Sequence, residues 1–66
     1  RRTVLRIYDI LGKEVTTLID GFLEPGYHEV RWNGENHMGQ KVASGFYFYR
    51  LDTGVHADVR KMLIVR

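Results

Sequence analysis

Residues 3–19 read TVLRIYDILGKEVTTLI, two stretches of β-forming residues separated by a turn sequence around Gly12. In the first stretch, Leu5 and Ile7 occupy alternate positions, which places them on one face of a strand. The second stretch, 14–19, is rich in Val and Thr, and Gly12 stands where a tight turn needs a positive φ. The pattern predicts an antiparallel hairpin.

A helix is an alternative for the second half of this segment. Apolar residues recur there at the helical spacing i, i+4, i+7 and i+11, namely Leu11, Val15, Leu18 and Phe22. The glycine at 12, the adjacent Thr16 and Thr17 and the short window favour the strand, because glycine and β-branched residues are poorer helix formers.

Three more strands are expected further along the chain. Residues 27–32 alternate cleanly in polarity after a Pro-Gly turn at 25–26. Residues 46–52 carry aromatic side chains on both faces, which predicts a central strand. Residues 57–65 are expected to form the last strand, in which Met62 and Ile64 alternate with Lys61, Leu63 and Val65.

These elements predict an all-β fold, a small antiparallel β-sandwich of about five strands. Its core is expected to contain inward-facing side chains of the strands and one loop residue: Leu5, Ile7, Val15, Val30, Trp32, Val42, Tyr47, Tyr49, Leu51, Met62 and Ile64. The composition agrees, because Val, Ile and Thr together provide 15 residues whereas Ala provides two.

The size of the chain limits it to one domain, residues 1–66. There is no cysteine, so neither a disulfide framework nor thiolate chemistry is expected. The net charge of +2 is too small to imply nucleic acid as a partner. The longest apolar run, 62–65, is far shorter than the roughly 20 residues that span a bilayer. Because the sequence begins at Arg1, we expect it to be an N-terminally truncated part of a longer protein.

No catalytic, cofactor-binding or metal site can be assembled from these residues. Ser44 lacks the glycine two positions earlier that a nucleophile elbow needs. The three histidines are not at the spacings that direct two imidazoles to one zinc ion. The irregular stretch 33–45 offers oxygen atoms but a single carboxylate, Glu35, which is too few for a calcium loop. No cofactor is therefore expected.

The aromatic residues allow a second interpretation. Interleaved with Arg6, Arg31 and Arg50, they could form a sugar or nucleic-acid platform that uses Trp32 and the tyrosines. In a sheet of this size, aromatic side chains more often fill the core and pack across strands.

Several segments resemble one protein family in order and spacing. Residues 7–15, IYDILGKEV, resemble its opening motif IYDxxGxxV, and residues 25–34, PGYHEVRWNG, resemble PAGxHxVxWDG with Asn33 in place of the aspartate. Residues 39–51 resemble GxxVASGxYFYRL, and 60–65 resemble its closing strand. The family is that of type IX secretion C-terminal sorting domains, which are similar in fold to the immunoglobulin-like domain of the flagellar hook-capping protein.

The resemblance implies an immunoglobulin-like, non-catalytic module that targets a longer protein for type IX export or surface attachment. It implies a secreted or cell-surface location in a bacterium with an outer membrane. The implied partners are the outer-membrane secretion machinery or the upstream domain of the parent protein. Recognition is expected at the end of the chain, at Arg60, Lys61, Met62, Leu63, Ile64, Val65 and Arg66. The alternatives are a passive structural or assembly domain like that of the hook-capping protein, and a carbohydrate-binding module.

The family usually carries a PNPFN segment and a strand ahead of the part seen here. Without that strand, residues 3–9 are expected to have an unpaired edge, and exposed β edges recruit other strands. The sequence therefore predicts strand pairing with an upstream segment or with a second copy of the chain.

Overall fold

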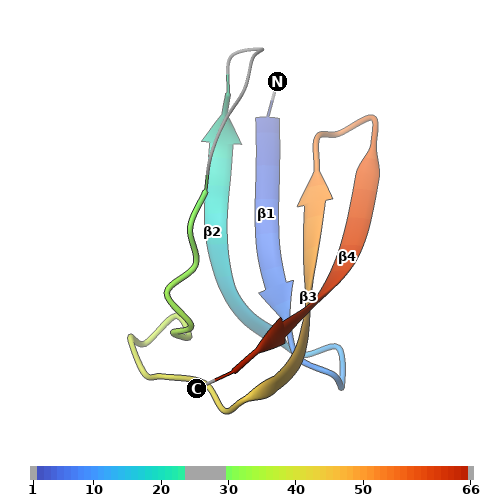
Figure 1. The fold of residues 1–66 in the computed structure, drawn as a ribbon. Coiled ribbons are helices and arrows are strands. Elements are labelled where there is room, and N and C mark those ends of the chain that lie inside the picture. The colour runs from blue at the N-terminus through green and yellow to red at the C-terminus, as the bar shows by residue number, and fades with distance from the viewer. Residues whose placement is uncertain (1, 24–29, 66) are drawn as a thin grey trace.

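The computed structural model describes residues 2–23 and 30–65, and the fold is all-β as predicted (Figure 1). Four strands form one antiparallel sheet, namely β1 (Arg2–Tyr8), β2 (Glu14–Phe22), β3 (Gly45–Asp52) and β4 (Ala57–Ile64). Their order across the sheet is β2-β1-β3-β4. The described ranges contain no helix, so the helical alternative for 11–22 is wrong. Accordingly, no helix suited to crossing a membrane occurs in this part of the chain.

β1 and β2 form the predicted hairpin, which is closed by a turn built on Asp9. The backbone N–H of Asp9 donates to the carbonyl of Lys13 at 2.9 Å, and that of Gly12 donates to the carbonyl of Asp9 at 3.0 Å. Asp9 Oδ1 also accepts hydrogen bonds from the N–H groups of Leu11 and Lys13, both at 2.9 Å. Gly12 has a φ of 83°, a left-handed conformation that glycine adopts without a steric penalty.

Two bulges in this hairpin decide which side chains of β2 face inward. The Cα register passes over one residue of β2 at the step Leu5/Arg6 of β1 and another at the step Ile7/Tyr8. The residues passed over are Leu18 and Val15, and both pack in the core. A bulge re-aims the side chain of its extra residue. Val15 and Leu18, whose spacing in the sequence resembled that of a helix, therefore belong to a strand with two bulges.

β3 lies in the interior of the sheet, as its aromatic residues on both faces predicted. It pairs with β1 from Asp52 opposite Val4 to Phe48 opposite Tyr8, and with β4 along its whole length. β1 is interior too, between β2 and β3. The unpaired edge predicted for residues 3–9 is thus wrong, because the return of the chain from β2 brings β3 alongside β1. In the described part of the protein, the edges of the sheet are β2 and β4.

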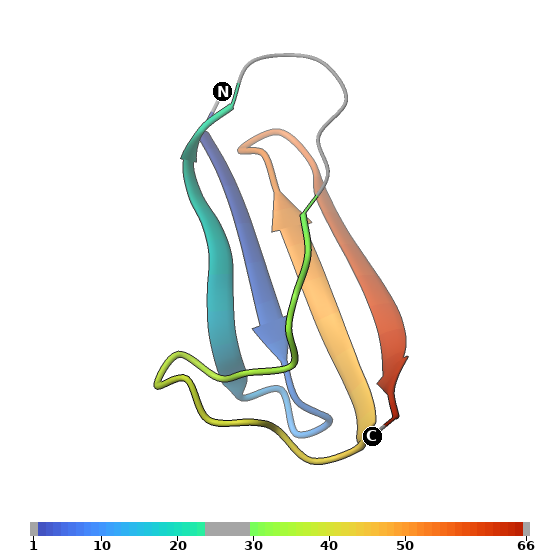
Figure 2. The ribbon, with the colours of Figure 1, turned by 60° about the vertical axis from the view of Figure 1, so that its left-hand side comes forward.

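Residues 30–44, which lead into β3 and are called the crossing segment below, cross one face of the sheet (Figure 2). Residues 30–32 form no strand, so the fifth strand predicted over 27–32 is wrong for these residues. Residues 27–29 and the predicted turn at 25–26 lie outside the described residues. Because residues 30–32 are not paired in the sheet, the alternation of polar and apolar residues there does not direct alternate side chains into the core. Trp32 packs against the core, whereas Val30 is 42% exposed, which corrects its predicted place in the core.

The core lies between the sheet and this crossing segment. Among the described residues, its buried apolar side chains are Ile7, Val15 and Tyr47. The partly buried side chains packed against them are Leu18, Trp32, Val42, Tyr49, Met62 and Ile64. Leu5 and Leu51 are half-buried. Leu18 was not among the predicted core residues, because a regular strand would have directed it and Val15 to opposite faces.

Tyr47 ties the core to the crossing segment. Its ring meets that of Trp32 edge to face, with centroids 5.5 Å apart and an interplanar angle of 71°. Its hydroxyl donates a hydrogen bond to the carbonyl of Ala43 at 2.6 Å. A tyrosine hydroxyl bonded to the backbone a few residues upstream is typical of the corners of immunoglobulin-type sandwiches. The contact agrees with the immunoglobulin-like architecture expected for this chain.

Candidate functional site

The face of the sheet opposite the core is a candidate interaction surface, hereafter the outer face. It is formed by the residues of β1, β3 and β4 that alternate with the core-facing ones: Val4, Arg6, Tyr8, Phe46, Phe48, Arg50, Asp52, Val59, Lys61 and Leu63. Phe46, Val59 and Leu63 are exposed there although they are large and apolar. Exposed apolar side chains gathered on one face, together with polar ones, are a mark of interaction sites.

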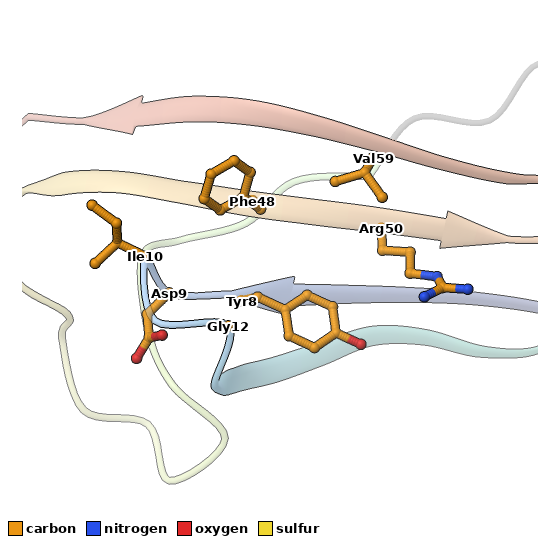
Figure 3. Close-up of a pocket in the computed structure, with 7 residues that line it drawn as sticks. All are labelled: Tyr8, Asp9, Ile10, Gly12, Phe48, Arg50 and Val59. Carbon is orange, nitrogen blue, oxygen red and sulfur yellow. The ribbon is translucent and has the colours of Figure 1, made fainter.

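An open hollow of about 330 Å³ lies on this face (Figure 3). Its lining comes from β1, the hairpin turn, β3 and β4: Tyr8, Asp9, Ile10, Gly12, Phe48, Arg50 and Val59. Apart from Asp9 and Arg50, the side chains at this hollow are apolar or aromatic. Ile10 belongs to the turn and is 70% exposed, so the apolar surface continues past the end of β1.

A second, smaller hollow of about 190 Å³ adjoins the first. It is lined by Val4, Arg6, Tyr8, Arg50 and Asp52, and it shares Tyr8 and Arg50 with the larger one. The outer face thus carries an apolar hollow beside a polar one, with a tyrosine and an arginine on their common border.

Two arginines dominate the charge of the polar hollow. Arg6 and Arg50 are register partners on adjacent strands, so their side chains emerge next to each other. Nε of Arg6 is 3.4 Å from Oε1 of Glu14, and a guanidinium nitrogen of Arg50 is 3.6 Å from Oδ2 of Asp52. These are loose, solvent-exposed ion pairs, which contribute little to stability. The Nε–H of Arg6 is buried and makes no hydrogen bond within the described ranges 2–23 and 30–65.

The far end of the outer face is apolar with one cation above it. Nζ of Lys61 lies 4.8 Å from the centroid of the Phe46 ring, which is a cation–π distance. Phe46 is the register partner of Leu63, and both are exposed.

The segment expected to carry recognition, 60–66, is divided between the two faces of β4. Met62 and Ile64 are partly buried and pack against the core. Lys61 and Leu63 lie on the outer face, and Arg60 pairs with Asp58 at 3.3 Å on the other side. Val65 is exposed beyond the end of β4, and Arg66 lies outside the described residues.

The irregular stretch 33–45 folds on itself around Asn36. The side-chain oxygen of Asn36 accepts hydrogen bonds from the backbone N–H groups of Met38 and Gln40 at 2.9 and 3.0 Å. The backbone N–H of Asn36 donates to the Gln40 carbonyl at 2.8 Å. The N–H of His37 donates to the carbonyl of Val15 at 3.1 Å and fixes the loop to β2. The polar groups of this loop thus hold its own backbone. Among the described residues, no three acidic or histidine side chains gather as a metal site would require.

The aromatic residues do not form one platform. Trp32, Tyr47 and Tyr49 pack on the core side, and the indole N–H of Trp32 donates to the carbonyl of Glu35 at 2.9 Å. Tyr8 and the two phenylalanines Phe46 and Phe48 lie on the outer face. Trp32 is partly buried and lies on the opposite side of the sheet from Tyr8, Phe46 and Phe48, so these described aromatic residues form no joint stacking surface.

The comparisons with known proteins agree with this architecture. A family model described as FlgD Ig-like domain matches residues 1–54. The comparisons with the curated proteins and with the solved structures gave no match.

Proposed function

Because the chain belongs to the FlgD Ig-like domain family, we propose that it serves as a structural and assembly domain that binds another protein and performs no chemistry. The family match over residues 1–54 is the observation that carries this proposal. The fold supports the proposal, because the core occupies one face of the sheet and the outer face remains available for contact.

The outer face is the surface that we assign to this role. It combines exposed apolar residues with arginines, and aromatic residues and arginine are enriched at protein interfaces. Side chains of a partner can fit into the two hollows of this face.

Photo-cross-linking in the parent organism tests this assignment. A cross-linking amino acid placed at Leu63, on the outer face, is expected to capture one discrete protein. The matched control is the same substitution at Val55, which is similarly exposed but lies in the β3–β4 turn. Equal capture from both positions, or none from Leu63, contradicts an assembly role for the outer face.

Type IX sorting, with a secreted or cell-surface location, is a second candidate function. It is supported by the sequence resemblance over residues 39–51 and 60–65 and by the exposure of Arg60 and Lys61 on an edge strand. Reversing both charges, Arg60→Glu with Lys61→Glu, keeps the core intact and is expected to retain the parent protein inside the cell. The control is Lys13→Glu in the exposed hairpin turn. Normal export of the double variant contradicts a sorting role for this segment.

A further inference from the structure

We infer that the outer face binds an extended segment of a partner protein in which an acidic residue stands two positions from a bulky apolar one. This inference rests on the proposed assembly function and names the partner chemistry. The acidic side chain binds between Arg6 and Arg50, and the apolar side chain enters the hollow lined by Tyr8, Ile10, Phe48 and Val59.

The arginine pair is the acid-binding element. Directly opposed like charges destabilise a sheet, and a carboxylate placed between them removes that repulsion. Each arginine has one carboxylate neighbour at 3.4 or 3.6 Å and keeps further guanidinium N–H groups for other acceptors. A planar guanidinium matches a carboxylate in geometry as well as in charge.

The spacing of the rows across the sheet sets the spacing of the ligand. Arg6 and Arg50 form one cross-strand row, and Tyr8 and Phe48 form the next row on the same face. Rows two residues apart are separated by about 6.6 Å. An extended peptide repeats at the same distance, so side chains at i and i+2 on its sheet-facing side meet the two rows in turn.

The apolar hollow explains why the ligand requires an apolar side chain as well as an acidic one. Phe48, Ile10 and Val59 leave a hollow of about 330 Å³ beside the arginines. Filling it with an aromatic or branched side chain removes apolar surface from water, which is the main favourable contribution to such contacts.

Two other occupants fit the surface less well. A second copy, stacked face to face about a two-fold axis through the hollows, brings its own arginines against Arg6 and Arg50. A phosphate-rich polymer or an anionic membrane meets Glu14 and Asp52 beside the same arginines, and these carboxylates repel a continuous negative surface. A single carboxylate flanked by apolar groups brings no arginine to the site and presents far less negative charge to Glu14 and Asp52 than a continuous anionic surface does.

The test is peptide titration of the isotope-labelled 66-residue chain followed by NMR. The probe is a blocked Gly-Asp-Ser-Phe-Gly peptide. The control peptides have Asn in place of Asp or Ala in place of Phe. The Asp–Phe peptide is expected to shift the resonances of Arg6, Tyr8, Phe48 and Arg50. The Asn peptide is expected to bind about tenfold more weakly because it loses one charge-assisted contact, and the Ala peptide is expected to lose at least about tenfold because it buries less apolar surface.

The protein variants are Arg6→Gln and Arg50→Gln, with Arg60→Gln as the matched control. Arg60 is also exposed and also pairs with an aspartate two residues away, but it lies on the other side of the sheet. We expect about tenfold loss of affinity for the first two variants and none for the control, with weaker binding at high salt. The NMR spectrum of each variant shows whether the fold is kept.

Several results overturn the inference. These are equal binding of the Asp and Asn peptides, unchanged affinity of Arg50→Gln, shifts confined to the core side, or no shifts at the solubility limit of the peptide. Self-association without peptide, or binding to phosphatidylserine vesicles in place of the peptide, also overturns it. Specific cross-linking from Leu63 combined with any of these results leaves the assembly function standing and rejects only the acidic ligand.

Discussion

At the scale of single residues, a few side chains support most of the core. Ile7 is 2% exposed and lies on the interior strand β1. Tyr47 and Val15 are the other buried apolar side chains in the described part of the chain. A domain of this size has a small stability margin, so single truncations at these positions have large effects.

Truncation of Ile7 is expected to cost more than truncation of an exposed isoleucine. Ile7→Ala should lower the free energy of unfolding by about 2–5 kcal/mol, through lost burial and the cavity left behind. Ile7→Val should lose about 1 kcal/mol, which keeps the comparison useful if the alanine variant fails to fold. Ile10→Ala, at a 70% exposed site, is the control and should change stability little. Urea denaturation measures all three, and similar losses at both sites would contradict the assigned core.

The hydrogen bond of the Tyr47 hydroxyl can be tested by a single substitution. Tyr47→Phe leaves the ring in place and removes the donor to the Ala43 carbonyl, so it should cost about 1 kcal/mol. Tyr49→Phe is the matched control on the same strand and face, since no hydrogen bond of its hydroxyl is found among the described residues. Equal unfolding midpoints for the two variants would show that the 2.6 Å contact has no net effect.

At the scale of elements, the β1–β2 hairpin combines a defined turn with a bulged strand. Asp9 and Gly12 set the turn, and the two bulges direct both Val15 and Leu18 to the core. The hairpin therefore contributes more apolar surface to the core than an alternating strand of the same length.

The turn glycine gives the test of this element. Gly12→Ala is expected to destabilise the protein by about 1–2 kcal/mol, because an L residue at a φ of 83° is strained. Gly21→Ala, in β2 without a positive φ and with nothing within 4 Å of the added methyl group, is the control and should be neutral or slightly stabilising. Thermal unfolding distinguishes them, and an equal response at both positions would contradict the turn geometry.

At the scale of the whole molecule, one sheet is covered on one face only. The crossing segment covers the core side, and no described segment covers the outer face, which carries apolar and cationic groups (Figure 2). This asymmetry agrees with the proposed assembly role, because the same sheet provides both the core and a contact surface.

The strand order predicts how protection against hydrogen exchange is distributed. Amides of β1 and β3, paired on both sides, should exchange most slowly, and those of β4 should exchange faster because β4 is an exposed edge strand. Exchange followed by NMR on the isolated chain measures this directly. Protection of β4 equal to that of β1 would indicate that a partner strand or a second copy covers the edge.

Local sequence patterns predicted the all-β class, the hairpin with its turn at Gly12, and the boundaries of β3 and β4 to within one residue. These features are local, because strand periodicity and turn chemistry act between residues close in the chain. The resemblance in motifs indicated type IX sorting domains, which are similar in fold to the hook-capping immunoglobulin-like domain, and the match over residues 1–54 confirms the FlgD Ig-like part of that prediction.

Only the tertiary structure decided the order β2-β1-β3-β4, the inward turn of Leu18, the exposure of Val30 and the pairing of Arg6 with Arg50. Arg6 and Arg50 are 44 positions apart, and the bulges depend on how β2 fits a neighbour and a core. Such features follow from contacts between distant parts of the chain, which local propensity does not encode.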